Sequence, residues 1–211
     1  MFGPEEARSE ALKRIREAAQ TRATELDLSG LELTELPSQI SEVPYLTTLK
    51  LQHNRLTALP PEIGKLMNLT ALNLQNNRLM VLPSEIGKLT NLALLNLQYN
   101  QLTALPAEVS KLTKLTELNL GSNRLTALPS EIGKLTKLKE LNLDGNRLTA
   151  LPPEIRKLTV LVGLFLHDTF LGNDTLGIPW EILGPTWIEV HSCHGPWPAS
   201  PDAILDYYFR K

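Results

Sequence analysis

The sequence has little cysteine, few aromatic residues and almost no net charge. Its 211 residues include one cysteine, Cys193, so no disulfide can form within the chain, and this composition suits a reducing compartment. We therefore expect a cytoplasmic location. Aromatic residues make up 5% of the chain and the formal net charge is −2, so neither nucleic acid nor a membrane surface is an expected partner.

Long apolar runs and nucleotide motifs are also missing. No run of about 18 apolar residues is present, so no transmembrane helix is expected. Residues 1–20 are charged throughout and lack the apolar core of a secretory signal. The phosphate-binding pattern G-x-x-x-x-G-K-[ST] does not occur, because Gly64, Gly87 and Gly133 are each followed by Lys-Leu. We expect no cofactor, and a nucleotide only through a domain outside this chain.

What the sequence does have is a segment repeated every 23 residues. Full units occupy 46–68, 69–91, 92–114, 115–137 and 138–160, a looser unit occupies 23–45, and a decaying one starts at Leu161. In the first full unit the apolar columns are Leu46, Leu49, Leu51, Leu56, Leu59, Ile63 and Leu66. A segment copied at fixed spacing is typical of a stacked structural unit, whereas a catalytic site is usually made once.

Each unit predicts one short strand, a turn and a return segment. Leu49 and Leu51 lie two apart, the period of a strand with one buried face. Pro60 interrupts any regular ladder, and the Ile and Leu of the return segment, three apart, predict a helical or 3₁₀ turn cut short by Gly64. Because one unit cannot bury its apolar side chains alone, the units must stack, with their strands in a parallel sheet and their ends covered.

One polar column stands among the apolar ones: Asn54, Asn77, Asn100, Asn123 and Asn146. We expect these amides to point inward and to bond the backbone of their own and the adjacent turn, which would form a ladder down the stack. A row of ligand-binding amides is the alternative.

Together these residues resemble a known family. The pattern L-x-x-L-x-L-x-x-N-x-L, followed by x-x-L-P-x-E-I-x-x-L, covers residues 23–171 about seven times and resembles the leucine-rich repeat in its 23-residue L-P-x-x-I form. The resemblance implies an α/β fold, a curved solenoid with short parallel strands on its concave face, and a role in protein recognition.

The N-terminal segment, residues 1–22, is predicted to cap the first repeat. Residues 4–20 read as a helix with Leu12, Ile15 and Ala19 on one face and Ala11 and Ala18 beside it. Glu5 and Glu6 lie in the first turn, where the helix dipole favours them. A helix that binds a partner is the alternative.

Residues 172–211 are predicted to form an aromatic C-terminal cap. Eight of the eleven aromatic residues lie at position 165 or later. Asp202 is expected to be the N-cap of a short helix. The alternative is a dedicated aromatic binding site.

Strings at both ends carry a second resemblance. "GIPWEIL" followed by "AILDYYFR", and the opening "RATELDLSGLELTELP", resemble the repeat domain of bacterial Roco-type proteins, in which the repeats precede a Ras-like GTPase domain. This resemblance implies that the natural chain continues beyond Lys211.

Little else in the sequence points to chemistry. His191, Cys193 and His194 are the one cluster of metal-type side chains, but no fourth ligand stands at a recognisable spacing and no group is in view to orient a Cys–His pair. We interpret the cluster as part of a capping loop and expect no enzymatic activity. Glutamates recur at Glu62, Glu85, Glu108, Glu131 and Glu154, each with a lysine three residues on. We interpret them as a solvated convex ridge with local ion pairs.

Function is expected where the units differ on the concave face. The residues predicted to bind a protein are Leu94, Asn96, Gln98, Tyr99, Glu117, Asn119, Glu140, Asn142, Asp144, Phe165, His167 and Asp168. Acidic side chains beside an aromatic one suit a basic segment of a partner. A rim of arginines, Arg55, Arg78, Arg124 and Arg147, is interpreted as solvated, with pairing to an acidic partner as the alternative.

We therefore expect a non-enzymatic recognition module of a larger Roco-like GTPase, which binds a partner or another domain of its own chain. A free-standing adaptor or a secreted effector is the alternative.

Overall fold

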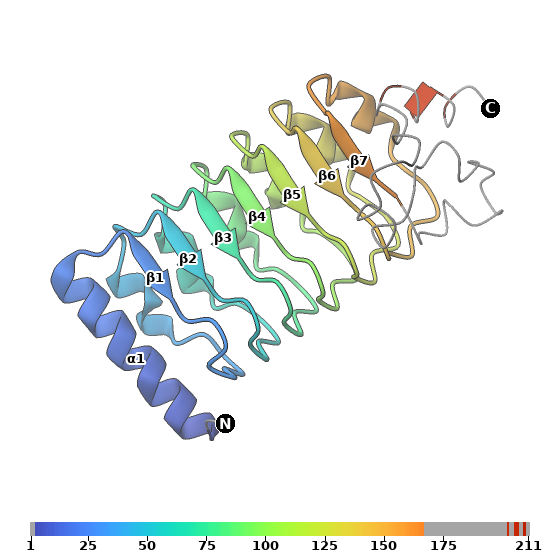
Figure 1. Ribbon diagram of the computed structural model, residues 1–211. Helices are drawn as coiled ribbons and strands as arrows, with labels where there is room; N and C mark the ends of the chain where they lie inside the picture. The colour runs from blue at the N-terminus through green and yellow to red at the C-terminus, as the bar shows by residue number, and fades with distance from the viewer. Residues whose placement is uncertain (1–2, 167–201, 203–204, 207–208, 210–211) are drawn as a thin grey trace, which may run out of the picture.

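The computed structural model describes residues 3–166 and, near the C-terminus, residues 202, 205–206 and 209. Helix α1 (Pro4–Thr21) comes first, and a seven-stranded sheet follows with its strands in chain order (Figure 1). The strands are β1 (Glu25–Asp27), β2 (Thr48–Lys50), β3 (Ala71–Asn73), β4 (Leu94–Asn96), β5 (Glu117–Asn119), β6 (Glu140–Asn142) and β7 (Gly163–Phe165). All neighbouring strands are parallel, as the repeat predicted.

The register of the sheet places equivalent residues of successive repeats side by side. Leu49 pairs with Leu72, and Leu72 pairs with Leu95, so that each column of the sequence becomes a straight row across the strands. In every strand the middle residue is buried and its two neighbours are more accessible. This alternation is the one expected for a strand with a single buried face.

Short 3₁₀ helices form the side of the stack opposite to the strands (Figure 1). They are η1 (Ser38–Glu42), η2 (Pro61–Lys65), η3 (Ser84–Lys88), η4 (Ala107–Lys111), η5 (Ser130–Lys134) and η6 (Pro153–Lys157). The predicted 3₁₀ turn is therefore confirmed. The role predicted for Gly64 is wrong, because η4 and η6 end at the same point of the repeat with Ser110 and Arg156 in its place. A Cβ atom at Gly64 would lie 3.0 Å from the backbone oxygen of Glu85, so the glycine permits close stacking of the next repeat.

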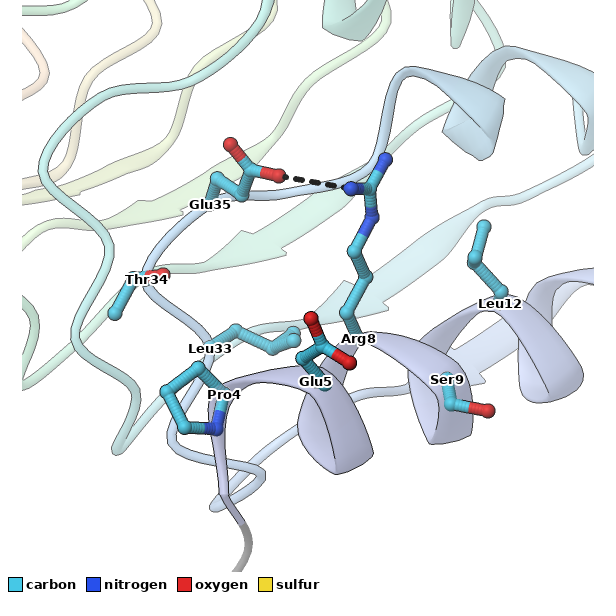
Figure 2. A pocket seen from close by; sticks show the side chains of 8 residues that line it. All are labelled: Pro4, Glu5, Arg8, Ser9, Leu12, Leu33, Thr34 and Glu35. Carbon is cyan, nitrogen blue, oxygen red and sulfur yellow. Dashed lines mark ion pairs between the residues drawn. The ribbon is translucent and has the colours of Figure 1, made fainter.

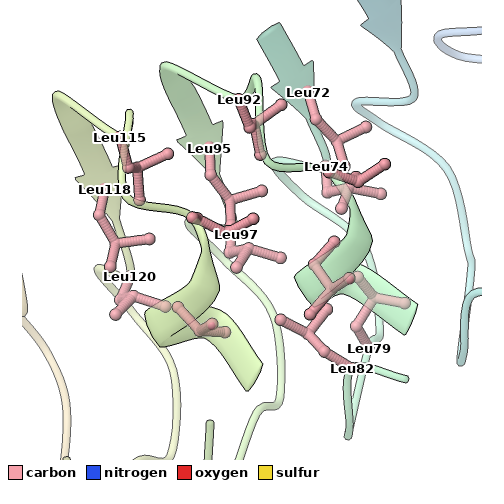
Figure 3. Close-up of a cluster of buried hydrophobic side chains, with 14 of the residues drawn as sticks. Leu72, Leu74, Leu79, Leu82, Leu92, Leu95, Leu97, Leu115, Leu118 and Leu120 are labelled. Carbon is pink, nitrogen blue, oxygen red and sulfur yellow. The ribbon is translucent and has the colours of Figure 1, made fainter. Parts of the chain in front are cut away.

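The core runs between these two sides as columns of leucine. Figure 3 shows the side chains of three consecutive repeats, in which those of Leu72, Leu95 and Leu118 follow one another from strand to strand. All three are at most 1% exposed. Each buried leucine contributes roughly 1.5–3 kcal/mol, most of which is offset by the entropy lost when the chain is ordered. The stack is therefore stable as a set of units and not unit by unit.

Helix α1 packs against β1 and η1 at one end of the stack (Figure 1). Its buried residues are Ala7, Ala11, Ile15 and Ala18. Of the residues predicted for this face, Ala11, Ile15 and Ala18 are buried, whereas Leu12 and Ala19 are only partly buried. The small alanines let the helix approach the first repeat closely, and the larger Leu12 lies at the edge of the contact.

At the other end, described residues near the C-terminus lie against the last repeats. Leu205 is 5% exposed and belongs to the core, while the guanidinium of Arg156 donates a 3.1 Å hydrogen bond to Asp206 and lies 5.6 Å from the ring centre of Phe209. These three observations place the described C-terminal residues at the open end of the core, where a cap is expected. In the part of the chain that is described, no helix has the length and apolar character needed to cross a bilayer.

Candidate functional site

A small hollow on the strand face gathers most of the residues predicted to bind a protein. Its lining is Leu94, Asn96, Glu117, Asn119, Glu140, Asn142 and Phe165, together with Leu95 and Leu118. We call this site the acidic hollow. Leu95 and Leu118 belong to the apolar columns of the repeat, and no sequence signal marks them as part of a surface. The hollow encloses about 160 Å³, which suits one side chain of a partner better than a drug-sized ligand.

Two carboxylates face solvent next to each other in this hollow. Glu117 and Glu140 are paired residues on β5 and β6, and both side chains are exposed. Neither forms an ion pair with any residue that the structure describes. Like charges directly opposite each other on adjacent strands destabilise a sheet. The scaffold therefore does not explain this pair, whereas a cation from a partner would.

The other end of the same face is already neutralised. Lys50 of β2 donates a hydrogen bond to Glu25 of β1, and this bond, together with the charge of the carboxylate, raises the pKa of the Lys50 ammonium. An acidic residue on these strands thus pairs with a cation when the neighbouring strand supplies one. For Glu117 and Glu140 the neighbouring strands supply none among the described residues.

Phe165 closes the acidic hollow on one side. Its ring lies over Gly163: a Cβ atom at this glycine would be 3.0 Å from Cε2 of the ring and 3.5 Å from Cγ of Glu140. Gly163 therefore leaves the space in which the ring lies beside Glu140. A cation held by that carboxylate would come close to an aromatic ring, which also attracts cations.

The strand asparagines in the hollow have a structural role that the sequence did not predict. The side-chain oxygens of Asn96, Asn119 and Asn142 each accept a hydrogen bond from the backbone N–H two residues further on, at 2.9–3.1 Å. Asp27 accepts the equivalent bond from Ser29 at 2.8 Å. These side chains hold the end of each strand, as Asn and Asp commonly do in turns.

The remaining predicted residues lie outside the hollow. Gln98, Tyr99 and Asp144 follow the strands, and His167 and Asp168 lie outside the described residues. Tyr99 is 52% exposed and has a left-handed backbone with φ of 56°. The same column is left-handed at His53, Asn76, Ser122 and Gly145. A backbone turn in each of these repeats restricts which residue types fit this column. The residue types found there are therefore not by themselves an indication of binding.

The inner asparagine column has the bonds that a ladder requires. The five residues are at most 7% exposed. Nδ2 of Asn100 donates to the carbonyl oxygens of Leu97 and, in the preceding repeat, Leu74, each at 3.0 Å. Oδ1 of Asn100 accepts from the N–H of Leu79 at 3.0 Å, and the other four asparagines repeat this pattern. With these bonds made, the amides are not directed toward a ligand.

The ion pairs predicted for the convex ridge are not formed. None of the described Glu–Lys pairs in η2 to η6 is within ion-pair distance. The aliphatic chain of Lys88 instead lies over Gly64 of the preceding repeat, where a Cβ atom would be 3.1 Å from its Cδ. The pKa of Glu131 is lowered by hydrogen bonds from its own backbone N–H and from Ser130, and the charge of Lys134 contributes least.

A larger groove lies between α1 and the loop of the first repeat (Figure 2). It measures about 510 Å³ and is lined by Pro4, Glu5, Arg8, Ser9, Leu12, Leu33, Thr34 and Glu35. Its arginine already has a partner, because Arg8 and Glu35 form an ion pair at 3.7 Å across the groove. We therefore regard it as the seam between the helix and the repeats.

Metal binding finds no support in the described part of the chain, where no group of three or more His, Cys, Asp or Glu side chains could hold an ion. The cluster of His191, Cys193 and His194 lies outside the described residues.

Comparison with known proteins identifies the class of protein. A model described as "Leucine-rich repeat region" matches residues 62–143, and one described as "Leucine Rich Repeat" matches residues 45–66 and 137–158. No match was found among curated proteins. The fold and these matches agree that the chain is a leucine-rich repeat protein, with its repeats stacked as a curved solenoid.

Several solved structures are similar to this chain. A leucine-rich repeat protein of Leptospira interrogans is 39% identical with a TM-score of 0.58, over 73% of this chain and 45% of that one. An internalin of Listeria monocytogenes is 29% identical with a TM-score of 0.58, over 64% and 39%. The plant peptide hormone receptor RGFR1, solved in complex with RGF2, is 31% identical with a TM-score of 0.59, over 64% and 22%. The aligned part is thus less than half of each of these proteins.

Proposed function

We propose that this chain is a non-enzymatic recognition module that binds a basic segment of a protein through the acidic hollow. The observation that carries the proposal is the adjacent, exposed pair Glu117 and Glu140, which has no cation among the described residues. Leu94 and Phe165 line the same hollow and offer apolar contact to the stem of a lysine or arginine. The plant receptor in complex with RGF2 supports the general role, since it is a similar solenoid with a bound partner.

The test is binding of a short fluorescein-labelled peptide of alternating lysine and alanine, followed by fluorescence anisotropy. The double variant Glu117→Gln/Glu140→Gln keeps the shape of both side chains and removes their charge. We expect it to bind about five- to tenfold more weakly than the unchanged protein, because two charge pairs are lost.

The matched control removes two carboxylates from the convex ridge, as Glu62→Gln/Glu85→Gln. It should bind the lysine peptide within about twofold of the unchanged protein, a change well below that expected from the lost charge pairs. Equal weakening by both double variants would show an effect of net charge alone and would contradict the proposed site. Glu117→Gln/Glu140→Gln binding as well as the unchanged protein would contradict it too.

We further propose that the module forms the N-terminal part of a larger cytoplasmic Roco-like GTPase and binds a partner or another domain of its own chain. The support for this is the resemblance at the two ends of the sequence and the single cysteine. The test is to read the source gene past the codon for Lys211. An open frame that reaches G-x-x-x-x-G-K-[ST] would support the GTPase, and a stop codon would favour a free-standing adaptor or effector.

A further inference from the structure

A row of arginines runs along one edge of the solenoid, directly after the inner asparagines. Arg55, Arg78, Arg124 and Arg147 occupy equivalent positions, with Gln101 between the two pairs. We call these four residues the arginine rim. Backbone hydrogen bonds align the row, since the N–H of Arg78 donates to Leu56 and that of Arg147 to Leu125, both at 2.9 Å. The backbones of adjacent members are therefore about 4.8 Å apart, as neighbouring strands are in a sheet.

The first repeat shows what a carboxylate does in this row. Glu32 stands where the later repeats have arginine, and it forms an ion pair of 3.1 Å with Arg55 on the next repeat. In contrast, Arg78, Arg124 and Arg147 are exposed and form no ion pair with any described residue. Arg124 and Arg147 are adjacent like charges, an arrangement that the scaffold alone does not favour.

Two exposed apolar residues lie next to the rim. Met80 and Val81 are 53% and 58% exposed, and they replace the Thr-Ala pair that four of the full repeats carry at these positions. Arg78 and Met80 flank the buried Leu79 in sequence, and both of them are exposed. An exposed Met-Val pair that departs from the repeat pattern indicates a contact surface, since the scaffold does not require it.

The rim is also hollowed at its N-terminal end. A depression of about 240 Å³ is lined by Glu32, His53, Asn54, Arg55, Asn76, Asn77 and Arg78. His53 and Asn76 are held there by a contact of 2.8 Å between Nδ1 and Nδ2. The depression is the size of a few side chains. Arg55 is already paired with Glu32 there, so among its lining residues Arg78 is the cation left for a ligand.

We propose that the arginine rim, with Met80 and Val81, binds an extended acidic segment of a protein. Carboxylates spaced along that segment would pair with Arg78, Arg124 and Arg147 as Glu32 pairs with Arg55, and an apolar side chain would lie on Met80. A protein segment suits the site better than nucleic acid, because apolar residues flank the arginines and the net charge of the chain is −2. This surface is separate from the acidic hollow and takes a ligand of opposite charge.

The test uses a short fluorescein-labelled peptide that repeats glutamate and leucine, measured by fluorescence anisotropy at low salt and at physiological salt. The triple variant Arg78→Ala/Arg124→Ala/Arg147→Ala should weaken binding about tenfold or more at low salt, with a smaller difference when salt screens the charges. Met80→Ser/Val81→Ser should weaken binding of this peptide by about threefold or more at both salt concentrations, because apolar contact is not screened.

The matched control is Lys65→Ala/Lys111→Ala/Lys134→Ala, which removes the same charge from the convex ridge. It should leave the affinity for the acidic peptide within about twofold, whereas equal weakening by the two triple variants would overturn the proposal. The absence of binding to the unchanged protein would overturn it as well, as would tighter binding of a labelled single-stranded oligonucleotide through the same arginines. Circular dichroism confirms that each variant is folded before it is compared.

Discussion

Asn100 satisfies backbone groups of two repeats with a single amide. Its Nδ2 donates to Leu74 and Leu97 and its Oδ1 accepts from Leu79. Asn100→Leu leaves these buried groups unpaired, so we expect the free energy of unfolding to fall by about 1–3 kcal/mol. Urea denaturation followed by circular dichroism measures the change.

Asn68→Leu is the matched control for that substitution. Asn68 is exposed and makes one side-chain bond, to Pro44 at 2.9 Å. It should change the free energy of unfolding by less than about 0.5 kcal/mol. An Asn100→Leu variant as stable as the unchanged protein would contradict the ladder as a source of stability.

The inward position of Asn100 could be predicted from the sequence, and the backbone of its neighbour could not. An amide between leucines in a repeated unit has to be buried and bonded. Nothing in the sequence indicates the left-handed backbone of Tyr99, because tyrosine is uncommon at positive φ. The turn at this residue is defined by a hydrogen bond to the next repeat. The N–H of Tyr99 donates to the carbonyl of Gly121 at 2.9 Å, a contact that exists only after stacking.

At the scale of elements, α1 protects the first repeat through a narrow face. Ile15 is fully buried in this face and Leu12 lies at its edge. Ile15→Ala should lower the free energy of unfolding by about 2–5 kcal/mol, because it leaves a cavity between helix and repeat. Leu12→Ala is the control, and its smaller loss should be visible in the same urea titration. If Leu12→Ala cost more than Ile15→Ala, the assignment of the packing face would be wrong.

The 3₁₀ helices η2 to η5, each of which is followed by a further 3₁₀ helix, carry a small residue at one position. A Cβ atom at Gly133 would lie 2.5 Å from the backbone oxygen of Glu154, whereas Ser110 in the preceding repeat already carries a Cβ there. We expect Gly133→Ala to destabilise the protein by about 1–3 kcal/mol through overpacking. Thermal unfolding checks this.

Ser110→Ala is the control for the glycine substitution, since it adds no atom at the crowded position. Ser110→Ala should leave the melting temperature nearly unchanged. A Gly133→Ala variant with the same melting temperature as Ser110→Ala would show that the next repeat moves aside freely. The sequence led to a different reading of this column, as a helix stop, because propensity describes one chain segment and the close approach involves two.

At the scale of the whole molecule, each repeat contacts mainly its neighbours. Removing residues 92–114 deletes one full unit and joins β3 to β5 in an unchanged register. We expect this variant to unfold in one cooperative transition at a lower temperature than the full chain.

The control deletion is one residue shorter, residues 92–113. It shifts every later column by one position and moves the apolar side chains away from the core, so it should lose the cooperative transition. Circular dichroism melts distinguish the two variants. Two deletions with the same melt would show that the stack does not depend on its period.

The architecture could be predicted from the period, because a column that recurs every 23 residues has one way to stack. The acidic hollow was predicted in outline, since Glu117, Glu140 and Phe165 depart from the repeat on accessible positions. The part of the hollow lined by Leu95 and Leu118 could not be predicted, because these residues are indistinguishable in sequence from other core leucines. Nor could the sequence show that the strand asparagines hold their own strand ends.

The glycine column also acts on the shape of the solenoid. The strands are tied together by hydrogen bonds at a fixed spacing, whereas the 3₁₀ helices opposite them approach one another most closely at Gly64, Gly87, Ser110 and Gly133. A larger residue there would act as a wedge and would bend the stack more strongly about its strands. The angle between β5 and β6, which carry Glu117 and Glu140, can therefore be adjusted from the opposite side of the molecule. No residue in the acidic hollow has to change.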